Sequence, residues 1–185
     1  RLAGGARYEW SHILVDTFDL FDPAERINTD LKDEDIFPAV NLTYSITKDM
    51  SLRAGYSETT SRPEFHELAP FEFTDVRGGR TIKGNPNLKP AYIENYDLRW
   101  EWFFGQGELM SISGFYKDFD DAIERSIQPT IELRTTFVNA DDAWLYGVEF
   151  ELRKNLGFIA PALDNFFLIG NYIYSQSESE TEPRA

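Results

Sequence analysis

Several common features are missing from this chain of 185 residues, and each absence excludes a class of protein. There is no cysteine, which excludes disulfide frameworks, thiolate metal sites and cysteine nucleophiles. There is no apolar run of about 18 residues, which excludes a membrane-spanning helix. Basic residues are few, because 18 Lys and Arg stand against 32 Asp and Glu, and the net charge of -14 would repel nucleic-acid phosphates. We therefore expect no nucleic-acid partner.

Groups that could support catalysis or hold a metal are also scarce. The two histidines, His12 and His66, lie far apart and have no partners at ligand spacing, so we expect no metal site of this kind. No serine lies in a nucleophile-elbow context, and we expect neither an enzyme activity nor a cofactor. Three acidic groups could offer oxygen ligands to calcium, but none has EF-hand spacing, and we interpret them as solvated loops. These groups are Asp16, Asp19 and Asp22; Asp30, Asp33, Glu34 and Asp35; and Asp118, Asp120 and Asp121.

Apolar side chains make up 42% of the chain, and in short segments they alternate with polar ones. Within residues 95–102, every even position is apolar and every odd position is polar or charged. Such alternation predicts a β-strand with two chemically different faces. Helical periodicity is nowhere sustained for about a dozen residues, so we predict an all-β chain. The seven predicted strands are 2–15, 40–47, 50–57, 95–102, 108–117, 144–153 and 164–175.

The connections between the predicted strands alternate between long and short. Outer-membrane barrels place short turns in the periplasm and long loops outside. We therefore predict an antiparallel up-and-down transmembrane β-barrel whose first, third, fifth and seventh strands run outward. The predicted long connections are about 16–35, about 61–90 and one somewhere within 118–142; the short ones are 48–49 and 104–107, and 154–163 is intermediate.

The cost of moving charge into lipid predicts which face of these strands lies outward. In hydrocarbon every backbone polar group must be paired, so spanning strands must form a closed barrel with alternating faces. If strand 95–102 slipped by one residue, Asp97, Arg99 and Glu101 would enter lipid, and the arginine alone would cost roughly 2–4 kcal/mol at mid-depth. The apolar parity is therefore expected to face lipid. Charged residues on the opposite, inner parity include Arg53, Arg99, Glu101, Lys117, Glu149 and Arg153.

Aromatic side chains lie near the ends of the predicted strands, where a membrane-interface belt is expected. With the strand directions given above, most of them lie at the outer interface, whereas Trp100 and Trp102 approach the inner one. An alternative is that these rings fill the core of a soluble β-sandwich, although the alternation in loop length favours the barrel. The predicted interface aromatics are Trp10, Tyr56, Trp100, Trp102, Tyr116, Trp144, Tyr146, Tyr172 and Tyr174.

Seven such strands form only an incomplete barrel wall. Two open strand edges would remain, and exposed edges are templates for aggregation. The chain also begins at Arg1, without an initiator Met or a leader segment. We therefore expect residues 1–185 to be one partial barrel domain within a longer protein that supplies the remaining strands.

Several motifs together resemble the barrel region of TonB-dependent outer-membrane receptors, and the resemblance covers nearly all of the chain from about residue 36 onward. Residues 98–109 are similar to members of this family from Bacteroidota and related groups. The prolines near residue 90 fix backbone angles before a strand, which explains them without a ligand. The motifs are Arg62-Pro63, Glu67-Leu68-Ala69-Pro70, Gly84-Asn85-Pro86-Asn87-Leu88-Lys89-Pro90, Ser113-Gly114-Phe115-Tyr116-Lys117-Asp118, Tyr146-Gly147-Val148-Glu149-Phe150-Glu151-Leu152 and Asn171-Tyr172-Ile173-Tyr174.

The resemblance implies a barrel of about 22 strands around a plug domain, in the outer membrane of a Gram-negative bacterium. It implies import of a scarce nutrient, such as a siderophore–metal chelate, cobalamin or a glycan, with energy delivered by TonB. The implied partners are outer-membrane lipid, the plug, TonB acting through the plug, and a small-molecule or metal-chelate substrate. Two alternatives are a soluble β-sandwich that binds carbohydrate and a passive porin or adhesin barrel.

The predicted connection at 61–84 carries four Arg and Lys residues against four Asp and Glu residues, so it is richer in basic residues than the rest of this acidic chain. Arginine offers paired donors to carboxylate or phosphate, so an anionic or metal-chelate substrate could bind this segment on the outer side. The alternative is that these charges only balance loop acids or lipopolysaccharide. The candidate substrate-binding residues are Arg62, His66, Glu67, Arg77, Arg80 and Lys83.

Overall fold

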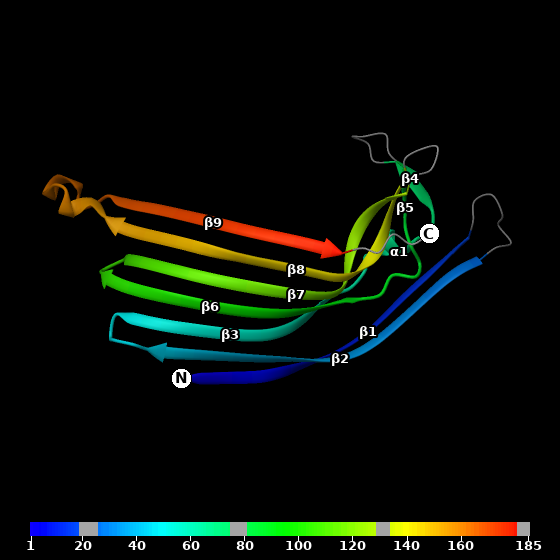
Figure 1. The fold of residues 1–185 in the computed structure, drawn as a ribbon, viewed down its shortest axis with the longest axis horizontal. Coiled ribbons are helices and arrows are strands. Elements are labelled where there is room, and N and C mark those ends of the chain that lie inside the picture. The colour runs from blue at the N-terminus through cyan, green and yellow to red at the C-terminus, as the bar shows by residue number, and fades with distance from the viewer. Residues whose placement is uncertain (19–25, 75–80, 129–133, 181–185) are drawn as a thin grey trace.

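The computed structural model describes residues 1–18, 26–74, 81–128 and 134–180, which form an open, twisted sheet (Figure 1). Nine strands lie in the order β1-β2-β3-β6-β7-β8-β5-β4, and β9 pairs with the inner part of the same β8 edge that β5 joins at its outer part. The long strands are β1 (Leu2–Phe18), β2 (Arg26–Ser45), β3 (Met50–Ser61), β6 (Ala91–Gly105), β7 (Glu108–Gln128), β8 (Arg134–Asn155) and β9 (Phe167–Glu180). The short elements are α1 (Phe65–Leu68), β4 (Glu72–Thr74), β5 (Thr81–Lys83) and the 3-10 turns η1 (Leu156–Phe158) and η2 (Pro161–Leu163).

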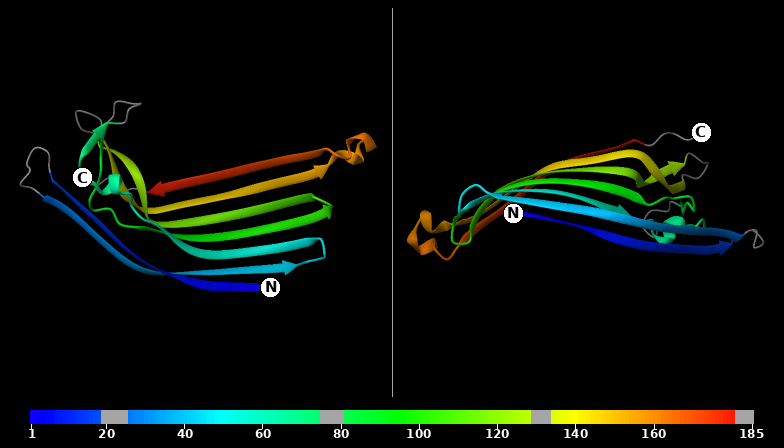
Figure 2. Two further views of the ribbon diagram at one scale, coloured as in Figure 1. Left: turned by 180° about the vertical axis from the view of Figure 1, so that it is seen from behind. Right: turned by 90° about the horizontal axis from the view of Figure 1, so that it is seen from below.

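The seven long strands confirm the predicted antiparallel sheet, which is an incomplete barrel wall. Each long strand pairs with its neighbour in the chain in antiparallel register. The 62–90 connection and the outer ends of the β1–β2 and β7–β8 hairpins lie at one end of the sheet, called here the outer end. The β2–β3, β6–β7 and β8–β9 connections lie at the other, called the inner end (Figures 1 and 2). None of the helices among the described residues has the length and apolar character needed to cross a membrane.

The predicted long connection at 16–35 is wrong in its extent, and the connection predicted somewhere within 118–142 occupies only a small part of that range. Most of 16–35 is strand, because β1 and β2 stay paired out to Phe18 and Arg26. Most of 118–142 is also strand, because β7 and β8 stay paired out to Gln128 and Arg134. These outer extensions carry charges on both faces, so they lack the alternation that marks the rest of each strand. Their backbone groups are satisfied by the partner strand of the same hairpin, which requires no apolar face.

The third long connection, the β3–β6 connection (residues 62–90), has structure of its own. It contains α1, and it contributes β5, which pairs in parallel with the outer part of β8 through Thr81–Arg134 and Lys83–Thr136. β9 ends opposite Asp142, so this outer part of β8 is free to accept β5. The connection thereby crosses from the end of β3 to β8, and Figure 1 shows it beside the upturned outer ends of β7 and β8.

The outer halves of β1 and β2 leave the sheet as a separate hairpin. Pairing between β2 and β3 ends at Ala39 and Ser57, whereas pairing between β1 and β2 continues outward. Pro38 stands next to the last pair, and proline cannot donate a ladder hydrogen bond. Both views of the ribbon show this outer hairpin diverging from β3 (Figures 1 and 2).

The two faces of the sheet differ as the sequence predicts. The apolar face carries the even positions of β6, where Leu98 is 53% exposed, although it lies near the middle of its strand. The polar face carries the odd positions, where Glu101 is only 6% exposed. No second sheet covers the apolar face in the described part of the chain. This contradicts the β-sandwich alternative, in which that face would be a buried core.

A small hydrophobic core lies on the polar face near the outer end. Leu68, Ile82 and Leu88 of the β3–β6 connection are buried with Phe137 of β8. Inward-facing apolar residues of the outer hairpin, including Ile13 and Leu31, pack against this cluster. The β3–β6 connection is therefore folded over the polar side of the sheet.

Candidate functional site

Arg62 follows β3 directly and gathers three acidic side chains of the outer hairpin. Its guanidinium lies 2.8 Å from Glu9 Oε2 and 3.4 Å from Asp35 Oδ2. Asp33 Oδ2 lies 4.0 Å from Arg62 Nε, which is buried and has no hydrogen-bond partner among the described residues. The Tyr92 hydroxyl, on β6, donates to Asp35 at 3.0 Å. This set, the Arg62 cluster, joins the diverging hairpin to the start of the β3–β6 connection.

Electrostatics within the Arg62 cluster shifts two of its groups. Hydrogen bonding from Arg62, with a smaller contribution from the charge of Arg7, holds the pKa of Glu9 below its ordinary value. Burial and the hydrogen bond to Asp35 raise the pKa of Tyr92 to about 12. Near neutral pH the Glu9 carboxylate is therefore charged and the Tyr92 phenol is protonated, which is the state that their contacts require.

Two asparagines fix the end of the β3–β6 connection against β8. The Asn85 side-chain amide donates to the backbone oxygen of Phe137 at 2.9 Å, and its oxygen accepts from the Asn87 amide at 3.0 Å. Asn139 pairs with both backbone groups of Lys89, each at 3.0 Å. The Asn-Pro-Asn-Leu-Lys-Pro motif is thus a structural clamp, as the proline positions predict.

Gly84 lies at the closest approach within the β3–β6 connection. A Cβ atom at this position would overlap the backbone carbonyl of Ala69 and approach the Glu67 oxygen to 2.8 Å. The adjacent Asn85 amide donates to that same Glu67 oxygen at 2.6 Å. Only glycine allows the two backbone segments to meet at this distance.

The candidate substrate-binding residues are partly occupied by structural contacts. His66, in α1, lies 3.1 Å from Glu64 and meets the Phe137 ring edge-on at 5.8 Å. Glu67 accepts the Glu64 amide at 2.9 Å in a capping box. Lys83 is in β5, where its backbone oxygen accepts from Thr136. The structure therefore places Arg62, His66, Glu67 and Lys83 on one connection, and Arg77 and Arg80 lie outside the described residues.

A charge network covers the polar face at the middle of the wall. Glu101 Oε2 lies 3.0 Å from Arg53, and its Oε1 lies 2.9 Å from Arg99. Arg99 also reaches Glu151 at 2.8 Å and donates to the Ser113 hydroxyl at 3.1 Å. The buried charge of Glu101 is stabilised because two arginines and the Ser51 hydroxyl pair with it.

Three other charges of the predicted inner parity behave differently. Lys117, Glu149 and Arg153 have no ion pair with another described residue, although each projects from the same face as the network. Lys117 and Glu149 are half-buried, and Arg153 is exposed. They are available to groups that approach this face.

A row of tyrosines crosses the apolar face toward its outer end. Tyr56, Tyr96, Tyr116 and Tyr146 stand directly opposite one another on β3, β6, β7 and β8. Tyr56 and Tyr96 donate to Glu58 and Glu94, each at 2.6 Å, so their rings lie on the apolar wall and their hydroxyls meet a polar group. Tyr96 was not among the predicted interface aromatics.

The other predicted interface aromatics fall on either side of this row. Trp144 stacks on Tyr146, with ring centroids 5.4 Å apart, whereas Trp102 pairs with Met50 and Met110 toward the inner end. Tyr172 and Tyr174 stand opposite Phe150 and Val148, farther inward along the ladder than the row. An oblique line of aromatics is expected if they mark one membrane level, because barrel strands tilt by about 35–45°. Trp10 is opposite Glu34 on the outer hairpin, and Trp100 is opposite Leu52 and Ile112.

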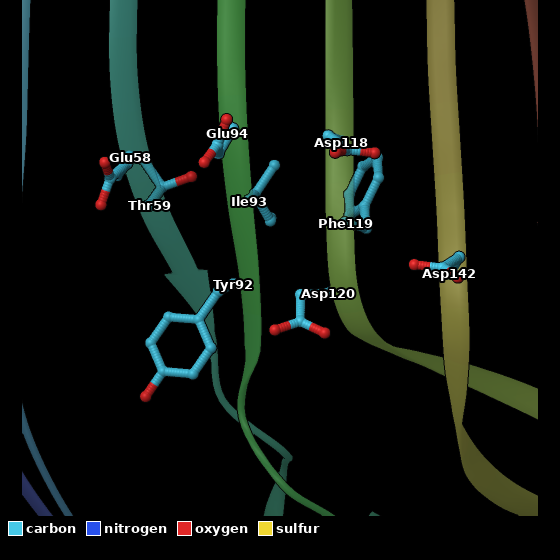
Figure 3. A pocket seen from close by; sticks show the side chains of 9 residues that line it. All are labelled: Glu58, Thr59, Tyr92, Ile93, Glu94, Asp118, Phe119, Asp120 and Asp142. Carbon is cyan, nitrogen blue, oxygen red and sulfur yellow. The ribbon is translucent and has the colours of Figure 1, made fainter.

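An acidic hollow lies just outside the tyrosine row, and its carboxylates come from four neighbouring strands (Figure 3). Glu94 stands opposite both Glu58 and Asp118, and Asp120 stands opposite Asp142. Figure 3 shows Glu58, Glu94 and Asp118 side by side across β3, β6 and β7. No group of His, Asp and Glu within the described ranges has the arrangement of a metal site. The row of charges marks where the apolar face ends.

Sequence reasoning missed the acidic partners of Arg62. Glu9 and Asp33 were not singled out as partners, because they are 53 and 29 residues from Arg62 and only the folded hairpin brings them together. The only signal was their spacing, since Glu9, Asp33 and Asp35 share the polar parity of two strands that pair with each other.

Comparison with known proteins gives a consistent family. The family model described as "TonB dependent receptor-like, beta-barrel" matches residues 1–184. A curated relative, an iron-regulated outer membrane virulence protein of Vibrio cholerae, is 29% identical over 154 residues. That match covers 78% of this chain and 22% of the relative, so the chain spans about a fifth of the relative's length.

Solved structures share the fold. The siderophore receptor PirA from Pseudomonas aeruginosa is 17% identical, with a TM-score of 0.65 over 83% of this chain and 31% of that one. The copper transporter OprC is 18% identical, with a TM-score of 0.69 over 100% of this chain and 27% of that one. At these identities the likeness extends to the fold alone.

Proposed function

Because this chain belongs to the TonB-dependent receptor-like β-barrel family, whose members are transport receptors of the Gram-negative outer membrane, we propose that it forms part of the barrel wall of an active importer. The proposed domain is residues 1–185 as a partial barrel, with the remaining strands and a plug supplied by the rest of a longer polypeptide. The proposed energy source is TonB, acting through the plug. Family membership argues against the passive porin or adhesin alternative.

The contrast between the two faces of the sheet carries this proposal. Bare apolar side chains such as Leu98 require lipid, and the network around Glu101 on the opposite face requires a polar surrounding. Within that polar interior, Lys117, Glu149 and Arg153 are the proposed wall contacts for the plug. A soluble protein would gain nothing from leaving an apolar face of this extent uncovered.

The proposed substrate is an iron chelate with anionic groups. One support is that a curated relative is named as iron-regulated. The other is that the β3–β6 connection carries five Arg and Lys residues against four Asp and Glu residues in an otherwise acidic chain. The proposed binding residues are those predicted from the sequence, namely Arg62, His66, Glu67, Arg77, Arg80 and Lys83. Arg62 and Glu67 act there mainly by holding the connection in place, because Arg62 pairs with acids of the outer hairpin and Glu67 accepts the Glu64 amide within the connection.

Arginine neutralisation in the full-length receptor tests the substrate proposal. The variant combines Arg77→Gln with Arg80→Gln, and Arg26→Gln on the other outer hairpin is the matched control. Binding of a panel of ferric siderophores is measured by titration. We expect the double variant to lose about tenfold or more in affinity, because two charge-assisted contacts contribute roughly 1.5–3 kcal/mol each, and the control to bind normally. Unchanged affinity in the double variant would reject these arginines as ligands.

Uptake separates the transporter from a passive pore. Cells that carry the full-length receptor are supplied with radiolabelled ferric siderophore before and after collapse of the inner-membrane proton gradient. For TonB-driven import we expect the siderophore to accumulate above its external concentration. We expect this accumulation to stop when the proton gradient is collapsed. Equilibration that is indifferent to the gradient would reject active transport.

A further inference from the structure

The connection between β8 and β9 is unlike the other turns at the inner end. Its segment 156–163 reads Leu-Gly-Phe-Ile-Ala-Pro-Ala-Leu and contains no charged residue. Phe158 is 69% exposed and Ile159 is 62% exposed, whereas the neighbouring turns carry Thr47-Lys48-Asp49 and Gln106-Gly107. Figures 1 and 2 show this connection projecting beyond the two hairpin turns at the same end. An apolar turn in that position requires a partner that is not water.

Contacts at its base show which side of the wall the turn occupies. The Lys154 ammonium lies 5.1 Å from the centre of the Phe104 ring and 5.4 Å from the centre of the Phe158 ring. Phe104 in turn contacts Trp102, with ring centroids 5.1 Å apart. Trp102 belongs to the apolar face, two positions along β6 from Trp100. Phe158 therefore continues the apolar face and does not turn toward the polar one.

Several backbone groups of the turn are paired within it. Asn155 caps η1 by accepting the Gly157 amide at 2.7 Å, and the Leu156 amide donates to the Phe166 oxygen at 2.9 Å. The Leu163 amide donates to the Ala160 oxygen at 2.9 Å. A segment with paired backbone groups can enter a membrane interface at low cost, whereas an open loop cannot.

Strand length places the turn at membrane depth. Transmembrane β-strands need about 9–11 residues to cross the hydrocarbon. Tyr172 and Tyr174 are predicted to lie at the outer interface. A span of about 9–11 residues counted from them toward the inner end passes Phe167, where β9 begins, and reaches η2 and the residues next to it. The turn, and not the strand alone, reaches the inner interface at this part of the wall.

We propose that the segment from Leu156 to Leu163 is a membrane anchor that lies in the inner leaflet of the outer membrane. Phe158 and Ile159 enter the acyl region of phospholipids, and the Lys154 ammonium, which donates to Glu108 at 2.6 Å, has further donors for a lipid phosphate. The lipid is phospholipid because the long 62–90 connection marks the opposite end of the sheet as the external one. The anchor is independent of the proposed substrate, so its test leaves the transport proposal untouched.

Spin labelling of the full-length receptor in phospholipid nanodiscs tests the anchor. A nitroxide is attached at Phe158→Cys and, separately, at Ile159→Cys, with Gln106→Cys on the neighbouring polar turn as the matched control. Collision rates with oxygen, which concentrates in lipid, and with a water-soluble nickel chelate are measured for each label. We expect the oxygen-to-nickel ratio to be several-fold higher at positions 158 and 159 than at 106.

Two results would overturn the anchor. A ratio at 158 and 159 equal to that at 106 would place the turn in water. Low collision rates with both reagents would mean that protein covers the turn, either another segment of the receptor or a periplasmic partner. If one of the two labelled variants fails to assemble, the other still gives the ratio.

Discussion

Individual side chains show how the acidic outer region is held together. Arg62 is the one basic group within reach of Glu9, Asp33 and Asp35 together among the described contacts. Like charges on neighbouring strands repel one another, so a shared arginine allows the hairpin to approach the β3–β6 connection. The planar guanidinium suits this position because it presents several donors at once.

Replacing Arg62 tests this role directly. We expect Arg62→Ala to weaken the hairpin contact by about 1–3 kcal/mol, because hydrogen bonds between charged groups are lost and three carboxylates remain together. Arg62→Lys keeps the positive charge but lacks the planar set of guanidinium donors, so it should recover only part of the lost stability of the hairpin contact. The measurement is the distance between spin labels at the exposed positions Asn28 and Asn87 in the full-length receptor. Arg7→Ala is the control, since Arg7 pairs with Glu9 at 2.8 Å but is largely exposed. An equal broadening of the distance in both alanine variants would contradict the assignment.

The contact between the outer hairpin and the β3–β6 connection is expected to weaken at both low and high pH. The pKa of Glu9 is lowered in the folded state, so its stabilising effect is present above the ordinary carboxylate pKa of about 4.3 and is lost as pH falls through the lowered value. The pKa of Tyr92 is raised to about 12, so its effect is present below the ordinary phenol value and is lost as pH rises through about 12. The label distance should therefore be constant from about pH 5 to 9 and broaden only outside that range. A transition near pH 7 would mean that another group controls the contact.

At the scale of elements, the sequence predicted the strands inside the membrane better than those outside it. Within residues 95–102 each side chain must suit lipid or a wet interior, so alternation is strict and the register is readable. Around Asp30–Asp35 neither face of the strand has to suit lipid. The sequence there is therefore charged on both faces and resembles a loop, although it is paired strand. The parallel pairing of β5 with β8 joins segments 53 residues apart and left no local signal. Asn139 likewise stands 50 residues from Lys89.

The β3–β6 connection is expected to depend on one glycine. Gly84→Ala places a methyl group against the Ala69 carbonyl, so the segments must separate, at a cost of about 1–3 kcal/mol for overpacking. Hydrogen exchange in residues 65–70 and 82–90 of the full-length receptor should become faster, and thermal stability should fall. Gly5→Ala is the matched control because a methyl group there meets nothing within 4 Å. Equal exchange in the two variants would show that the close approach is not required.

At the scale of the whole molecule, the wall separates two solvents. Lipid-facing side chains, the tyrosine row and the acidic hollow follow one another outward on one face, and the charge network occupies the other. Sequence alternation was sufficient to predict these faces, since it reports the chemistry on each side of a strand. It could not predict the folding of the β3–β6 connection over the polar face, because that depends on contacts among Leu68, Leu88 and Phe137 from distant segments.

The separation of solvents can be measured along a single strand. Single cysteines at each position of Asn95–Trp102 in the full-length receptor, reconstituted in lipid, are labelled with nitroxide and scored for collisions with oxygen. The account predicts high oxygen accessibility at Tyr96, Leu98, Trp100 and Trp102 and low accessibility at the four odd positions between them, with period two throughout. Uniform accessibility, or higher oxygen collision rates at the odd positions, would contradict it.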